Sequence, residues 1–225
     1  MSTSINSITF ESINKVGQTG DLVLFNSRKH WYDFIIEYFS SSHISHIGMI
    51  LKNPIYLDPS LNDGLYILES CIHNTVDDEI SHTKIDGVQI NKLDAVLEDF
   101  MNGKDSGHIY YRFLNYKRDI EFDNNIKQIV ESVYAKPYDT CVSDWLNAEL
   151  YLLDGEKVGD VHKTDTFWCS ALIAYIYVKL GFLNNNIPWT IISPGTFSIN
   201  NKTPGKLVFT KKCKLLKDML VKFTT

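Results

Sequence analysis

The sequence predicts an α+β fold, because strand-like segments dominate its first half and helix-like segments its second half. Residues 21–25, 44–52 and 65–70 are short runs rich in Val, Ile and Leu that end at turn-forming residues, as strands do. Residues 167–180 are long and apolar, and Gly181 follows where a left-handed helix cap belongs. These two patterns place a sheet before the main buried helix.

The other elements follow from hydrophobic spacing, in chain order. Apolar side chains recur at helical spacing in four further segments, 29–39, 93–101, 120–135 and 142–153. Two more strands are expected at 87–91 and 109–114. The tail, 206–225, fits either a closing strand or an amphipathic helix. With 225 residues, 44% of them hydrophobic, we expect a single domain over 1–225, with its motif-bearing core at about 17–200.

Composition and charge exclude several classes of function. A net charge of −5 and a pI near 5.8 argue against a nucleic-acid partner, which would need clustered Lys and Arg. The four cysteines form no CxxC pair, so we expect free thiols, no metal and no cofactor. Neither a signal peptide nor a membrane-spanning run is visible. The sequence therefore predicts a cytoplasmic protein, found in the host cytosol or virion if it is viral.

Cys169 lies near the start of the predicted helix, at about its third position. Free backbone N–H groups and the positive end of the helix dipole favour a thiolate there, and they can also hold an oxyanion. We expect Asp165 or Thr166 to cap this helix. The alternative is that Cys169 is a small buried side chain without chemistry, as we expect for Cys71, Cys141 and Cys213.

His46 begins an apolar strand, and Glu69 ends the next one. A cysteine nucleophile needs a base, and the base needs an orienting partner, which adjacent strands could supply. His46 and Gly48 share one strand face, where Gly48 leaves room for a substrate. In the alternative, His46 is an edge histidine and Glu69 a solvated strand end. His43 and His46 face opposite ways on a strand, so we expect no metal pair.

Five short motifs together resemble the circularly permuted branch of the NlpC-type papain-like proteins, which includes the YiiX and YaeF type and poxviral relatives. The motifs occur in the family's order over about 17–200: Gly20-Asp21-Leu22-Val23-Leu24-Phe25, Ser45-His46-Ile47-Gly48-Met49, Glu69-Ser70, Tyr138-Asp139 and Trp168-Cys169-Ser170-Ala171-Leu172. Ordinary papain-like enzymes place the cysteine before the histidine, whereas here the order is His, Glu, Cys.

The resemblance implies a small antiparallel, barrel-like sheet packed against helices. It implies Cys169 as nucleophile, His46 as general base and acid, and Glu69 as the orienting group. Tyr138, Gly48 and Trp168 would lie at the substrate pocket. The implied activity is that of a thiol hydrolase or acyltransferase, which cleaves an amide or ester bond through a Cys169 acyl-enzyme. The substrate would be a small molecule, a peptide or a lipid.

Two alternatives stay open. The chain could be a non-catalytic binding module, or a virion or structural module, that retains the groove. A helical tail would place Leu215, Leu216, Met219, Leu220 and Phe223 on one face with lysines around it, which would suit peripheral contact with a membrane. Residues 144–166 could form a lid or an insertion.

Overall fold

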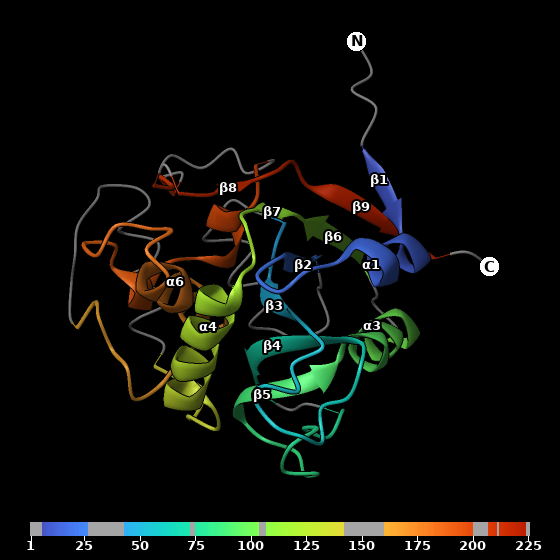
Figure 1. Ribbon diagram of the computed structural model, residues 1–225, viewed down its shortest axis with the longest axis horizontal. Helices are drawn as coiled ribbons and strands as arrows, with labels where there is room; N and C mark the ends of the chain where they lie inside the picture. The colour runs from blue at the N-terminus through green and yellow to red at the C-terminus, as the bar shows by residue number, and fades with distance from the viewer. Residues whose placement is uncertain are drawn as a thin grey trace.

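In the part of the chain that the structure describes, seven strands form one sheet, and helices pack on both of its faces (Figure 1). The computed structural model describes residues 6–26, 43–72, 75–103, 107–141, 160–199, 207–210 and 212–223. The sheet has the order β1-β9-β6-β2-β3-β4-β5. Its strands are β1 (Ser7–Thr9), β2 (Leu22–Asn26), β3 (His46–Lys52), β4 (Leu65–Cys71), β5 (Gly87–Lys92), β6 (His108–Arg112) and β9 (Met219–Lys222).

The helices divide between the two faces of the sheet. Cores on opposite faces are expected when side chains alternate along each strand. α4 (Ile120–Val133) and α6 (Cys169–Lys179) share a core with Ile47, Met49 and Leu68. α1 (Phe10–Val16) and α3 (Leu93–Asn102) share the other core, with Ile50 and Ile67. The α+β class predicted from the sequence is confirmed.

The sheet is open, which corrects the barrel-like sheet that we expected. Among the described residues, β1 and β5 lie at the two ends of the strand order and do not pair with each other. A small barrel fills its interior with its own side chains, whereas here both faces are covered by helices. The pairing is antiparallel from β9 through β5, and β1 alone runs parallel to its neighbour β9.

Most of the predicted strands are present, and the tail is extended. The predicted strands at 44–52, 65–70 and 87–91 correspond to β3, β4 and β5, and the segment at 109–114 divides into β6 and β7 (Leu114–Asn115). β8 (Lys214–Leu215) pairs with β7, and β9 joins the main sheet. The amphipathic tail helix is therefore wrong, and the closing strand is confirmed. The helices expected at 29–39 and 142–153 lie outside the described residues, as does most of 144–166.

α6 is buried along most of its length. Its beginning differs from the sequence prediction, and its end agrees with it. The helix begins at Cys169 with Trp168 as N-cap and without a side-chain cap, so Asp165 and Thr166 do not cap it. At the other end, Gly181 has φ of +72° and donates its N–H to the Val178 carbonyl, as predicted. Two 3-10 turns, η1 (Trp189–Ile191) and η2 (Pro194–Phe197), follow α6.

The aspartate of the first motif connects four segments beside β2. Asp21 is 1% exposed, and its carboxylate accepts hydrogen bonds from the Tyr111 hydroxyl at 2.7 Å and the Leu114 N–H at 2.8 Å. The Arg118 guanidinium and the Gln18 N–H complete the set at 2.9 and 3.0 Å. A buried carboxylate needs such partners to offset its desolvation. Asp21 therefore fixes the fold and lies outside the candidate site.

Candidate active site

His46 is the first residue of β3, and its imidazole is held by a carboxylate and an aromatic ring. Nε2 of His46 lies 2.6 Å from Oε2 of Glu69. The ring centroids of His46 and Phe25, which face each other across β2 and β3, are 5.5 Å apart. The His46 side chain is 22% exposed and that of Glu69 only 3%. The histidine is therefore oriented by a buried carboxylate while its ring stays partly accessible.

Glu69 reaches His46 from the neighbouring strand, and Asn91 supports it from the other side. Glu69 pairs with Gln89 of β5, and the Asn91 side chain donates Nδ2–H to Oε1 of Glu69 at 3.4 Å. Asn91 and Gln89 are fully buried. The two carboxylate oxygens thus have different partners, with Oε2 on the histidine and Oε1 on the amide, which fixes the plane of the carboxylate.

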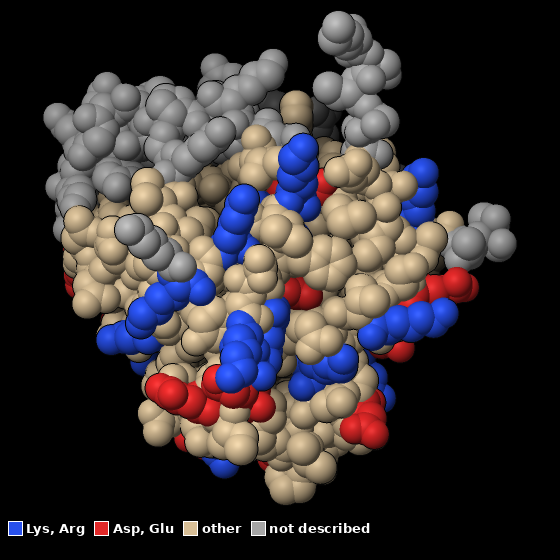
Figure 2. Space-filling view, turned by 45° about the horizontal axis from the view of Figure 1, so that its top comes forward, with Lys and Arg blue, Asp and Glu red and all other residues tan. Residues whose placement is uncertain are grey.

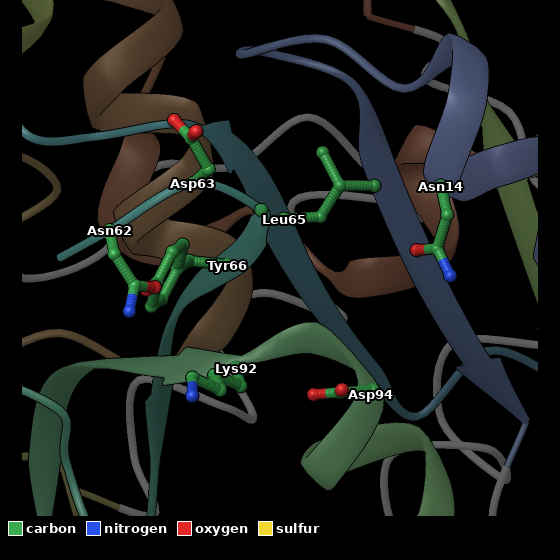
Figure 3. Close-up of a pocket in the computed structure, with 8 residues that line it drawn as sticks. Asn14, Asn62, Asp63, Leu65, Tyr66, Lys92 and Asp94 are labelled. Atoms are coloured by element: carbon green, nitrogen blue, oxygen red, sulfur yellow. The ribbon is translucent and has the colours of Figure 1, made fainter.

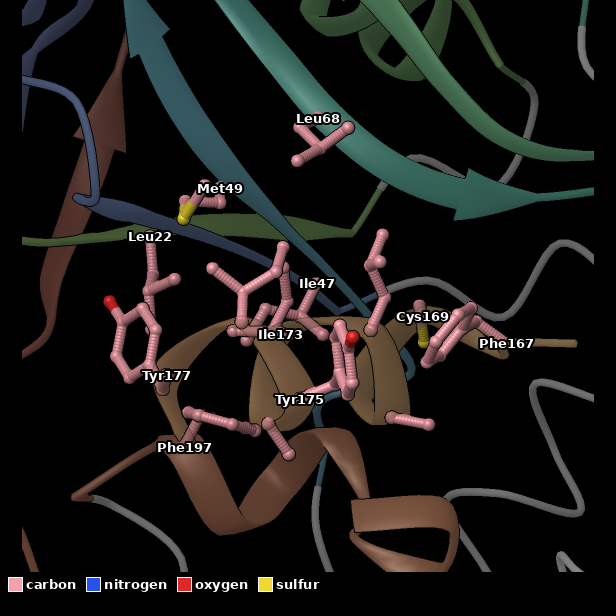
Figure 4. Close-up of a cluster of buried hydrophobic side chains, with 14 of the residues drawn as sticks. Leu22, Ile47, Met49, Leu68, Phe167, Cys169, Ile173, Tyr175, Tyr177 and Phe197 are labelled. Carbon is pink, nitrogen blue, oxygen red and sulfur yellow. The ribbon is translucent and has the colours of Figure 1, made fainter. Parts of the chain in front are cut away.

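Cys169 meets the same imidazole at the start of α6. Its side chain is 1% exposed and lies close enough to His46 to be one of the groups that raise the pKa of the imidazole. Because Nε2 of His46 is bound to Glu69, Nδ1 is the ring nitrogen left for the thiol. By strand alternation, His46 shares its sheet face with Ile50, on the side opposite α6. His46 is the first residue of β3 and Cys169 the first of α6, and Figure 4 shows Cys169 near the beginning of β3.

Hydrogen bonds from three side chains hold the beginning of α6 in place. The Ser70 hydroxyl of β4 donates to the Phe167 carbonyl at 2.6 Å. The Trp168 indole donates to the Thr190 carbonyl at 2.7 Å, and the Ser170 hydroxyl donates to the Ile192 carbonyl at 2.6 Å. All three donors are buried. The sulfur of Cys169 is thus positioned by the sheet on one side and by η1 on the other.

Cys169 occupies the first helical position and not the third. The first intrahelical hydrogen bond is the one from the Leu172 N–H to the Trp168 carbonyl, at 3.1 Å. The N–H groups of Cys169, Ser170 and Ala171 therefore precede that bond. These donors lie beside the sulfur at the positive end of the helix dipole, where negative charge on a thiolate or an oxyanion is stabilised.

The environment of His46 favours its protonated form. Burial by itself lowers the pKa of the imidazole. The hydrogen bonds and charges of Cys169 and Glu69 oppose burial and raise the pKa of His46 well above its usual value. A histidine that has taken the proton of a thiol is cationic, so this environment suits His46 to the role of base.

The three residues expected at the pocket have different surroundings. A Cβ atom at Gly48 would lie 2.5 Å from the Ile67 side chain, so packing accounts for this glycine. Trp168 is buried, and its indole is engaged by Thr190. Tyr138 is half-buried and forms a parallel β-bridge with Phe167, which places it close to the segment that leads into Cys169. Of the three, Tyr138 alone retains an exposed surface near the cysteine.

Sequence reasoning missed two residues near the histidine, Cys71 and Asn91. Cys71 follows Glu69 by two positions on β4 and interacts electrostatically with His46, Glu69 and Cys169. Burial raises the pKa of Cys71 to about 12, which keeps it a neutral thiol. The period of two along β4 could have indicated Cys71. Asn91 could be found only once the pairing of β4 with β5 was known.

Metal-binding groups and hollows are the other features of the described residues that could mark a site. Among the described residues, no group of three or more His, Cys, Asp and Glu side chains could hold a metal ion. A polar hollow of about 290 Å³ lies where β4 starts and β5 ends, opposite the ends that carry Cys71 and Gly87 (Figure 3). It is lined by Asn14, Asn62, Asp63, Gly64, Leu65, Tyr66, Lys92 and Asp94.

No helix in the described part of the chain is both long and apolar enough to cross a bilayer.

Comparison with solved structures finds distant likenesses in fold. No protein-family model matches the sequence, and no curated protein matches it. The structure is similar to the crystal structure of the metalloprotein YiiX from Escherichia coli O157:H7, with a TM-score of 0.45 and 15% sequence identity. The match covers 88% of this chain and 96% of that chain.

Proposed function

We propose that the protein is a thiol hydrolase or acyltransferase that cleaves an amide or ester bond through an acyl-enzyme on Cys169. The observation that supports it is the 2.6 Å hydrogen bond between His46 and the buried Glu69 carboxylate, with Cys169 close enough to the same imidazole to raise its pKa. A nucleophile, a base and an orienting acid in this order are the parts that acyl transfer requires.

In the proposed reaction, the Cys169 sulfur attacks the carbonyl carbon of the substrate, and His46 takes the thiol proton. The N–H groups at the start of α6 stabilise the oxyanion. His46 then gives its proton to the leaving amine or alcohol as the bond to the carbonyl carbon breaks. Water or an acceptor alcohol or amine attacks the thioester, again losing its proton to His46, and the Cys169 thiolate leaves.

Amide or ester substrates of three kinds stay open for this reaction: small molecules, peptides and lipids. Tyr138 is the candidate pocket residue, because it is half-buried beside the segment that precedes Cys169. Its hydroxyl and ring could contact both polar and apolar substrates.

The low exposure of Cys169 favours a second candidate function. At 1% exposed, its side chain has little direct access to solvent. A binding module that lost its activity could retain this buried cysteine for packing, since free cysteines are commonly buried.

Reaction with a thiol-directed acylating ester distinguishes a thiol hydrolase or acyltransferase from an inactive binding module. We expect the full chain to form a Cys169 acyl-adduct and to release the ester's leaving group over many turnovers. Cys169→Ala should abolish this, and His46→Ala should lower the rate by about a hundredfold or more. His43→Ala is the matched control, because His43 precedes β3 and is exposed. Turnover that survives in Cys169→Ala, or that depends on His43 and not on His46, would overturn the proposal.

A further inference from the structure

The C-terminal segment presents lysines to solvent on the face of the molecule that carries β8 and β9. Lys212, Lys214, Leu216 and Lys217 are exposed, whereas Cys213 and Leu215 between them are buried. We call the four exposed residues the lysine ribbon. In Figure 2, where the top of Figure 1 is turned toward the viewer, lysine and arginine side chains are spread over the visible face with acidic side chains among them.

The extended backbone fixes the direction of these side chains. Leu215 pairs with Leu114, and the Leu216 N–H donates to the Phe113 carbonyl at 2.8 Å. Side chains two apart on an extended chain share a face, so Lys214 and Leu216 point outward together, and Lys212 precedes them in a turn. The alternation of buried and exposed residues confirms this direction. The ribbon is therefore held by the two-stranded sheet and does not depend on a tail helix.

Charge is segregated into this part of an acidic protein. Residues 212–222 contain four lysines and one acid, Asp218, although the chain as a whole has a net charge of −5. Asp218 is buried, and it is paired with the Arg112 guanidinium at 2.8 Å. Its charge is thus neutralised inside the protein, and the lysines of the ribbon face solvent without it.

An apolar side chain stands among these cations. Leu216 is 41% exposed between Lys214 and Lys217. The aliphatic stems of lysines lie along apolar surfaces while their ammonium groups reach toward charged lipid headgroups. An exposed leucine adds apolar area that can enter the boundary between headgroups and acyl chains. Double-stranded nucleic acid would offer the charge but no partner for the leucine.

From this juxtaposition we propose that the lysine ribbon binds the surface of an anionic phospholipid bilayer. The proposal concerns a surface separate from Cys169, so it stands or falls independently of the proposed activity. Lys212 lies over Gly181 at the end of α6 and has a packing role as well. The test therefore uses Lys214, Lys217 and Leu216.

Co-sedimentation of the full chain with vesicles tests the proposal. We expect binding to vesicles of 70% phosphatidylcholine and 30% phosphatidylserine, little binding to pure phosphatidylcholine, and weakening as salt rises. Lys214→Gln with Lys217→Gln should weaken binding about 25-fold, at about fivefold for each lysine. Leu216→Ser should weaken it further, most visibly at high salt.

The matched control is Lys84→Gln with Lys92→Gln, which removes the same charge from exposed lysines outside the ribbon. It should leave binding unchanged, with circular dichroism confirming that every variant is folded. Equal binding to neutral vesicles, or an equal loss in the control variant, would overturn the proposal. Tighter binding to a 20-base-pair DNA duplex than to anionic vesicles at the same salt would reassign the ribbon to nucleic acid and also overturn it.

Discussion

Nε2 of His46 and Oε2 of Glu69 are 2.6 Å apart, although the two residues come from different strands and differ greatly in exposure. A short contact between an imidazole and a buried carboxylate fixes the orientation of the ring and keeps a proton on Nε2. Four predictions follow from the contacts around this pair.

Replacing Glu69 by Gln should reduce acylation of Cys169 markedly without abolishing it. Glutamine keeps the size and one acceptor but loses the charge that stabilises the imidazolium. We expect a fall of at least about tenfold in turnover, smaller than the loss in Cys169→Ala. Ester turnover and thermal unfolding measure the two effects, and the unfolding temperature should change little. Unchanged turnover in Glu69→Gln would remove Glu69 from the site.

The thiols should differ in reactivity toward alkylating agents near neutral pH. Burial raises the pKa of Cys71 to about 12 and that of Cys213 to about 11, so both remain neutral thiols. Cys169 has His46 as a proton acceptor and should be labelled first. Peptide mass mapping after limited treatment with iodoacetamide measures the order. Faster labelling of Cys71 than of Cys169 would contradict the assignment, and Cys213→Ser is the control that should leave the Cys169 rate unchanged.

The contribution of His46 to stability should depend on pH in a defined direction. The pKa of His46 is raised in the folded protein. Protonation of His46 therefore contributes its full stabilisation at pH values below the pKa of histidine in the unfolded chain, which is about 6.5. That stabilisation is lost as the pH rises through the folded pKa. The free energy of unfolding of the unaltered protein, relative to His46→Gln, should therefore be constant and greatest below about pH 6 and decline as the pH rises above about 6.5.

Urea unfolding at a series of pH values measures this difference. His108→Gln is the matched control, because His108 is exposed on β6. Its difference from the unaltered protein should stay constant over the same range. A His46 difference that grows with rising pH would have the wrong sign and would contradict the raised pKa.

Asn91 should act as a positioning residue for Glu69. Asn91→Leu keeps a similar volume but leaves Oε1 of a buried carboxylate without this donor, at a cost of about 1–3 kcal/mol in the free energy of unfolding. The carboxylate should then stabilise the His46 imidazolium less, so the acid limb of the Cys169 alkylation profile should move to higher pH.

Two measurements separate positioning from a general loss of stability in Asn91→Leu. Urea unfolding gives the stability cost, and the alkylation rate between pH 5 and 9 gives the shift of the acid limb. Asn115→Leu, at an exposed position of β7, is the control and should move neither. A destabilised Asn91→Leu protein with an unmoved alkylation profile would leave Asn91 a structural role only.

Sequence patterns predicted the strands around the site because those strands have strong local signals. Runs such as 44–52 and 65–70 are apolar and end at turn residues, so β3 and β4 are where they were expected. The tail was ambiguous because Lys214, Leu216 and Lys217 fit both periods. Pairing of β8 with β7 and of β9 with β6, which is a long-range contact, determines its extended form.

The candidate site shows the same division between local and long-range information. His46 and Glu69 were recognisable from their places at strand ends, and the structure brings them together with Cys169. The sequence prediction placed the start of α6 too early. The N-cap is Trp168, which has no capping side chain and is held instead by the hydrogen bond of its indole to a carbonyl of η1. Tertiary contacts of that kind leave no periodic signal in the sequence.

The parallel pairing of β1 with β9 has a consequence for the solution behaviour of shortened forms. β1 is an edge strand that covers β9 through the partners Ser7–Leu220, Ile8–Val221 and Thr9–Lys222. A chain that lacks residues 1–9 would present β9 as a new edge, with open backbone donors and acceptors next to a partly apolar strand. Such an edge is a template for pairing with another molecule. By covering β9, the short strand β1 therefore limits self-association of the protein.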